Sequence, residues 1–100
     1  MKLKKGVTLT GIRPELLVGI MVVDSAYRFI GEDLVITSVT DSKHSKTSLH
    51  YVGFAFDCRI RNINKDDLAV LLNEIKNGLT DEFDVVLESN HIHIEYQPKR

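Results

Sequence analysis

Apolar residues recur at helical spacing between Pro14 and Ile30. The periodic positions are Leu16, Leu17, Ile20, Val23, Tyr27 and Ile30, and the polar positions elsewhere on the helical wheel are Glu15, Asp24, Ser25 and Arg28. Pro14 suits the first turn of a helix, where its missing N–H costs nothing, and Gly31 is placed to end the helix. The pattern predicts an amphipathic helix that buries one apolar stripe.

A second helical pattern begins after Asn64. Asn64 is a good N-cap, and Asp66 and Asp67 fall in the first turn, where the helix dipole favours negative charge. The apolar stripe of this helix consists of Leu68, Leu71, Leu72 and Ile75. We expect Gly78 to follow the last helical residue, because glycine readily adopts the conformation that closes a helix.

Four further segments have the composition or the alternation of strands: Leu34–Ser38, Gly53–Ile60, Phe83–Glu88 and His91–Tyr96. Alternation along the second segment directs Phe54, Phe56 and Cys58 to the core and Gly53, Ala55, Asp57 and Arg59 to the opposite face. Along the last segment it directs Ile92, Ile94 and Tyr96 to the core and His91, His93 and Glu95 away from it. We therefore expect a sheet with one apolar and one polar face.

The last two strands are separated by Ser89 and Asn90 alone, which predicts a two-residue hairpin turn. In such a hairpin Glu88 and His91 lie opposite each other, so their side chains emerge on the same face of the sheet. The polar run over residues 39–49 is expected to be a surface loop, and such loops often carry function.

The order of elements is helix, strand, loop, strand, helix and hairpin, which predicts one α+β domain over residues 1–100. We expect a small antiparallel or mixed sheet of about four strands, with two helices on one face and the polar face open. A chain of 100 residues is long enough to bury a core of this kind.

Composition is that of a soluble globular protein, with 43% apolar and 27% charged residues. The net charge of −1 gives no general attraction to nucleic acid or to an anionic membrane. The apolar run Leu16–Val23 is too short to span a bilayer, and the basic start Met1–Lys5 lacks the unbroken apolar stretch of an export signal. We therefore expect cytoplasmic synthesis without membrane insertion. Cys58 is the single cysteine, which excludes an internal disulfide.

The polar positions include the residue types of a catalytic zinc site. His50, Asp57 and His91 offer two imidazoles and one carboxylate, and Glu88 offers a second carboxylate near His91. Catalytic zinc sites use three protein ligands and leave one position for water, and a nearby base takes a proton from that water. Three ligands from two distant segments require a fold that brings the segments together.

Two spaced motifs carry a resemblance to a known family. They are Ser48-x-His50-x-x-Gly53-x-Ala55-x-Asp57 and Glu88-x-x-His91. The pair resembles the signature of the zinc D-Ala-D-Ala peptidase family, which includes D-Ala-D-Ala carboxypeptidases, vancomycin-resistance dipeptidases and phage L-alanyl-D-glutamate endolysins. That family shares its fold with the N-terminal domain of hedgehog proteins. Residues 11–16 and 34–38 also resemble its opening helix and first strand.

The resemblance implies a zinc ion bound by His50, Asp57 and His91, with Glu88 as the catalytic base. The implied reaction is hydrolysis of peptide bonds that involve D-amino acids in peptidoglycan stem peptides, by a D-Ala-D-Ala carboxypeptidase or an L-Ala-D-Glu endopeptidase. Small size and the lack of an export signal suit a phage or prophage lysis enzyme, which reaches the wall of its bacterial host after the membrane is breached.

The chain departs from the family pattern at one point. Members usually have an arginine shortly after the first strand that helps to hold the substrate, whereas residues 38–41 contain none. Lys43, Lys46 and Arg59 are candidate replacements, and we favour Arg59 because it shares the polar face with Asp57.

Two further residues are candidates for substrate contact. Ser48 is expected either to hydrogen-bond the substrate or to order its loop. His93 faces the same way as His91 and is a candidate alternative ligand, ligand-orienting donor or substrate contact.

Two rival functions stay open at this point. The first is a binding module that keeps the site without peptidase activity, and the second is a virion-associated or assembly protein with an inert site. The missing arginine at residues 38–41 is compatible with both of these functions. Neither the bond that is cut nor the oligomeric state follows from the sequence.

Overall fold

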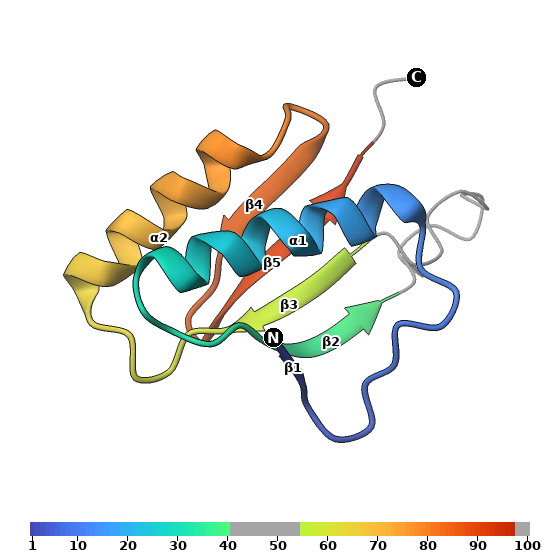
Figure 1. Cartoon of the computed structure of the whole chain (residues 1–100), viewed down its shortest axis with the longest axis horizontal. Coiled ribbons are helices and arrows are strands. Elements are labelled where there is room, and N and C mark those ends of the chain that lie inside the picture. Colours follow the sequence, from blue (N-terminus) through green and yellow to red (C-terminus); the bar gives the residue numbers. More distant parts are fainter. Residues whose placement is uncertain (41–54, 98–100) are drawn as a thin grey trace.

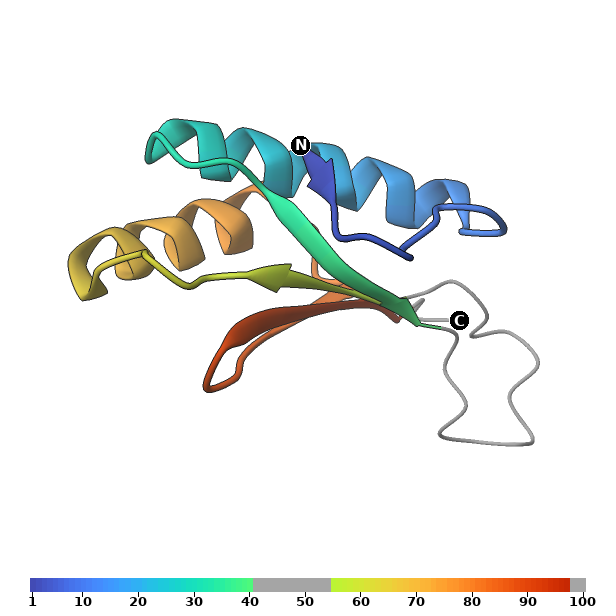
Figure 2. The ribbon, with the colours of Figure 1, turned by 90° about the horizontal axis from the view of Figure 1, so that it is seen from below.

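The structure is a computed structural model that describes residues 1–40 and 55–97. Its elements in chain order are β1 (Lys2–Leu3), α1 (Pro14–Phe29), β2 (Val35–Thr40), β3 (Ala55–Arg59), α2 (Lys65–Gly78), β4 (Phe83–Leu87) and β5 (His91–Tyr96). The strands form one mixed sheet in the order β1-β2-β3-β5-β4, in which only β1 pairs in parallel. Both helices cover the same face of this sheet (Figures 1 and 2).

The predicted α+β class and the two helices on one face are confirmed, but the described residues form five strands rather than about four. The additional strand β1 pairs with β2 through Lys2 opposite Val35 and Leu3 opposite Ile36. The Lys2 N–H donates to Leu34 O and the Lys4 N–H to Ile36 O. A strand of two residues has no alternation to detect, so its partner cannot be predicted from local pattern.

Helix α1 begins at the predicted Pro14 and ends one residue before Ile30, and Gly31 follows with a positive φ of 78°. Its buried residues are Leu16, Gly19, Ile20, Val23, Ala26 and Tyr27. Leu17, which we placed in the buried stripe, is instead 44% exposed, because the next position in a helix turns about 100° away from Leu16.

Helix α2 is capped as predicted, since the Asp67 N–H donates to Asn64 Oδ1 at 2.8 Å. The predicted role of Gly78 is wrong, because Gly78 is the last helical residue and not the one that follows. A Cβ at this position would lie 2.6 Å from Val22 Cγ1. Glycine therefore allows α2 to approach α1 closely here.

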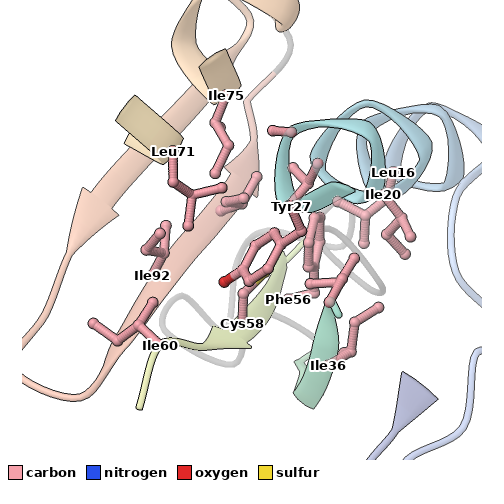
Figure 3. Close-up of a cluster of buried hydrophobic side chains, with 14 of the residues drawn as sticks. Leu16, Ile20, Tyr27, Ile36, Phe56, Cys58, Ile60, Leu71, Ile75 and Ile92 are labelled. Atoms are coloured by element: carbon pink, nitrogen blue, oxygen red, sulfur yellow. The ribbon is translucent and has the colours of Figure 1, made fainter. Parts of the chain in front are cut away.

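The hydrophobic core lies between the two helices and the sheet (Figure 3). Fully buried residues from both helices and three strands contribute to it, among them Ile20, Tyr27, Ile36, Phe56, Cys58, Leu71, Ile75, Ile92 and Ile94. The predicted core positions of β3 and β5 are thus confirmed, except Phe54, which lies outside the described residues. No helix in the described part of the chain is long and apolar enough to cross a membrane.

The face of the sheet away from the helices carries the polar residues of β3 and β5. Asp57 on β3 lies opposite His93 on β5, and Arg59 lies opposite His91. These two neighbouring strands hold most of the candidate residues that the structure describes.

Candidate functional site

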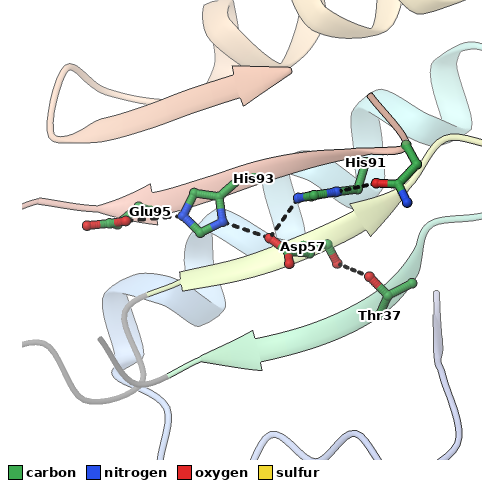
Figure 4. Close-up of polar contacts among 6 residues, drawn as sticks. Thr37, Asp57, His91, His93 and Glu95 are labelled. Carbon is green, nitrogen blue, oxygen red and sulfur yellow. Dashed lines mark hydrogen bonds and ion pairs between the residues drawn. The ribbon is translucent and has the colours of Figure 1, made fainter. Parts of the chain in front are cut away.

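Three candidate side chains from β3 and β5 converge on the polar face of the sheet. Asp57 points between His91 and His93 (Figure 4). Residues opposite each other in an antiparallel pair lie on the same face, and so do residues two apart on one strand. The register of Asp57 with His93 therefore brings both imidazoles to this carboxylate.

His91 contacts a different neighbour through each of its two ring nitrogens. Its Nε2 lies 3.8 Å from Asp57 Oδ1, and its Nδ1 lies 2.7 Å from Asn90 Oδ1. The contact with Asn90 fixes the orientation of the His91 ring, and Nε2 is the ring nitrogen that faces Asp57. A hydrogen bond of this kind orients the ring of a metal-binding histidine.

The separation of His91 and Asp57 can be compared with a tetrahedral zinc site. Ligand atoms about 2.0–2.2 Å from zinc lie about 3.3–3.6 Å from each other. The observed 3.8 Å between His91 Nε2 and Asp57 Oδ1 is close to this range. The donor types also fit, because zinc accepts imidazole nitrogen and carboxylate oxygen.

His93 is held between two carboxylates. Its Nδ1 lies 2.7 Å from Asp57 Oδ1, and its Nε2 lies 3.1 Å from Glu95 Oε1. Burial lowers the pKa of His93, but the hydrogen bonds to Asp57 and Glu95 outweigh it, so that the pKa is raised above 6.5. Both ring nitrogens of His93 contact carboxylates. Of the roles expected for His93, this favours the one that orients Asp57 over those of metal ligand and substrate contact.

Glu88 closes the hairpin as expected. Its N–H donates to His91 O at 2.8 Å, which confirms the predicted two-residue turn of Ser89 and Asn90. The Glu88 side chain is exposed, and its carboxylate makes no hydrogen bond or ion pair with any residue in the described ranges 1–40 and 55–97. Its predicted role as base is therefore supported by position in the chain and not by a contact.

Two predicted site residues, His50 and Ser48, lie outside the described residues. Within residues 1–40 and 55–97, no group of three or more histidine, cysteine, aspartate or glutamate side chains is arranged to hold a metal ion. The structure thus brings together Asp57 and His91, and the convergence of His50 with them stays a prediction.

Arg59, our candidate replacement for the family arginine, lines a cavity that also contains Asp57 and His91. The remaining lining residues are Lys4, Thr37, Arg61 and Asn90. The sequence analysis does not predict that these four residues line the cavity. Asn90 could have been noticed as the neighbour of His91. Lys4 comes to the cavity through the pairing of β1 with β2, and Thr37 through the pairing of β2 with β3, which no local pattern reveals.

Comparison of the chain with known protein families, with curated proteins and with solved structures finds no match. The resemblance to zinc D-Ala-D-Ala peptidases therefore depends on the two spaced motifs, and the function drawn from it is a proposal.

Proposed function

We propose that this chain is a zinc-dependent peptidase that hydrolyses bonds involving D-amino acids in peptidoglycan stem peptides. The observation that carries the proposal is the approach of His91 Nε2 to Asp57 Oδ1, at 3.8 Å. These two residues come from the two separate motifs of the resemblance, and the proposed mechanism requires them to meet. The hedgehog/DD-peptidase type of fold and a phage or prophage source belong to the same proposal.

The proposed ligands are His50, Asp57 and His91. When bound, zinc polarises the carbonyl of the substrate and lowers the pKa of a water molecule to roughly 7. The protein orients two of the ligands through residues that do not bind the metal. Asn90 orients the ring of His91, and His93 holds Asp57 through a 2.7 Å hydrogen bond.

Glu88 acts as general base and then as general acid. It takes a proton from the attacking water and passes that proton to the leaving amine. Glu88 directly follows β4, and its backbone N–H donates to His91 O across the turn, which supports a role beside a proposed ligand rather than as a ligand. Ser48 and Arg59 bind the substrate beside the reacting bond, and the charge of Arg59 replaces that of the missing arginine at residues 38–41.

Digestion of purified peptidoglycan, with products identified by mass spectrometry, tests this function. The zinc-loaded protein should release either D-Ala or fragments cut between L-Ala and D-Glu, and a chelator should stop the release. Glu88→Gln should keep zinc binding and reduce turnover by about 10²- to 10⁴-fold, because general acid–base catalysis contributes an effect of that size. Hydrolysis by Glu88→Gln at the wild-type rate would show that the base is another group.

A second candidate function is a zinc-binding module without peptidase activity, associated with a virion or with another assembly. The absence of an arginine at residues 38–41 favours it. Zinc binding without release of D-Ala or of L-Ala and D-Glu products would support this module over the peptidase.

A further inference from the structure

A cavity on the polar side of the sheet is lined by two candidate metal ligands and by three cationic side chains. Asp57 and His91 line it together with Lys4, Arg59 and Arg61. The cations come from two parts of the chain: Lys4 follows β1, and Arg59 and Arg61 lie at and just after the end of β3. Only the tertiary fold brings them to one cavity.

The backbone at each cation is fixed by hydrogen bonds or by turn geometry. The Lys4 N–H donates to Ile36 O at 2.9 Å. The Tyr27 hydroxyl donates to Arg59 O at 2.9 Å. Arg61 precedes Asn62, whose φ of 72° belongs to the left-handed region that asparagine tolerates well. The cations therefore extend from a backbone of defined shape.

None of these three cations forms an ion pair with a carboxylate of the described residues, although other cations do. Lys2 pairs with Asp33 at 3.7 Å, and Arg28 pairs with Asp24 at 3.2 Å. The one carboxylate that lines the cavity, Asp57, is instead hydrogen-bonded to His93. The cavity consequently has an excess of positive charge within the described part of the chain.

We propose that Lys4, Arg59 and Arg61 form a subsite that binds a carboxylate of the substrate beside the bond that is cut. The inference rests on the proposed peptidase function for the class of substrate. Arginine and lysine bind carboxylates through short, charge-assisted hydrogen bonds, which are stronger than neutral ones. Lys4 and Arg61 thus extend the substrate-binding role given above to Arg59.

Two carboxylates of a stem peptide are candidates for binding at this subsite. One is the C-terminal carboxylate of D-Ala-D-Ala, and the other is the carboxylate that D-Glu keeps after it is linked into the peptide. Both lie close to a candidate scissile bond. The subsite therefore predicts that amidation of the relevant carboxylate weakens binding, whichever of the two bonds is cut.

Binding to metal-free protein tests the subsite separately from catalysis. The probes are N-acetyl-L-Lys-D-Ala-D-Ala and L-Ala-D-Glu-L-Lys, each compared by calorimetric titration with the same peptide amidated at the carboxylate in question. In at least one pair, the free carboxylate should bind about fivefold or more tightly, and the difference should shrink with added salt. The pair that shows the difference identifies which carboxylate is bound.

Lys4→Gln and Arg61→Gln should each weaken binding of the preferred peptide about threefold to tenfold, because each removes one charged donor. Lys2→Gln is the matched control, since Lys2 lies two residues before Lys4 and does not line the cavity. All three positions are exposed, so the variants should fold. Equal binding of free and amidated peptides in both pairs, or equal effects of Lys4→Gln and Lys2→Gln, would overturn the subsite.

Failure of the subsite and failure of the peptidase give different results. If the zinc-loaded protein cuts neither peptide but the metal-free protein prefers a free carboxylate, the subsite stands and the peptidase does not. If the protein cuts free and amidated stem peptides at equal rates, and Lys4→Gln does not change these rates, the peptidase stands and the subsite does not.

Discussion

At the scale of single residues, the candidate site depends on how Asp57 is held. His93 Nδ1 lies 2.7 Å from Asp57 Oδ1, and the Thr37 hydroxyl donates to the backbone O of Asp57 at 3.4 Å. Glu95 in turn holds His93 from its other side, at 3.1 Å. The orientation of one proposed ligand is thus set by a chain of neighbours that are not themselves among the proposed ligands.

His93→Ala should weaken zinc binding about 10- to 100-fold, because loss of a group that orients a ligand has an effect of that size. Competition with a chromogenic chelator measures the zinc affinity. Val86→Ala is the control, since Val86 lies opposite His93 on β4 but makes no hydrogen bond through its side chain. An affinity equal to that of the wild type would refute the orienting role, and complete loss of binding would show that His93 is itself a ligand.

The buried thiol of Cys58 leads to a prediction of how the free energy of unfolding changes at alkaline pH. Burial, followed by the nearby charge of Asp57, raises the pKa of the Cys58 thiol despite the opposing hydrogen bond with Tyr27. A group whose pKa is raised in the folded state stabilises that state below its unfolded pKa, and this contribution is lost as the pH rises. The unfolded thiol titrates near pH 8.5, so the free energy of unfolding should fall by up to about 1.4 kcal/mol per pH unit above that value.

Urea unfolding between pH 7.5 and pH 10 measures this slope. Cys58→Ala is the matched variant, and it should be less stable overall but should lose most of the slope below pH 10. Tyr27, whose pKa burial also raises, adds a similar effect only above about pH 10, where a free tyrosine ionises. A slope unchanged by Cys58→Ala would contradict the assignment.

At the scale of elements, agreement with the sequence was best where the pattern is long or strictly alternating. Strand β5 has the predicted bounds His91–Tyr96, and α1 begins at the predicted Pro14. The prediction that Gly78 follows the end of the helix is wrong because the close approach of Gly78 to Val22 is a tertiary contact. Local rules for helix ends do not include such contacts. Strand β1 was missed because two residues hold no period.

The N-cap of α2 gives a prediction at this scale. Asn64→Ala should lower the free energy of unfolding by about 1 kcal/mol, because the Asp67 N–H loses its acceptor. Asn64→Ser keeps a side-chain acceptor for this N–H and should have a much smaller effect. Urea unfolding of both variants measures the difference, and equal losses of stability would show that the cap bond contributes nothing.

At the scale of the whole molecule, the fold brings distant motifs to one face of the sheet. The sequence placed Asp57, His91 and His93 on a polar face, because alternation along a strand is a local property. It could not place Lys4 beside them, because that requires the parallel pairing of β1 with β2. It also could not show which hydrogen bonds engage His93, since these depend on the register between β3 and β5.

The central claim is that His50, Asp57 and His91 bind one zinc ion. Titration of the metal-free protein with zinc, against a competing chelator, tests this claim most directly. The account predicts one zinc per chain in the wild type and at least a 100-fold loss of affinity in both His50→Ala and His91→Ala, with Lys2→Gln unchanged. A wild type that binds no zinc, or a His50→Ala variant that binds it as tightly as the wild type, would contradict the account.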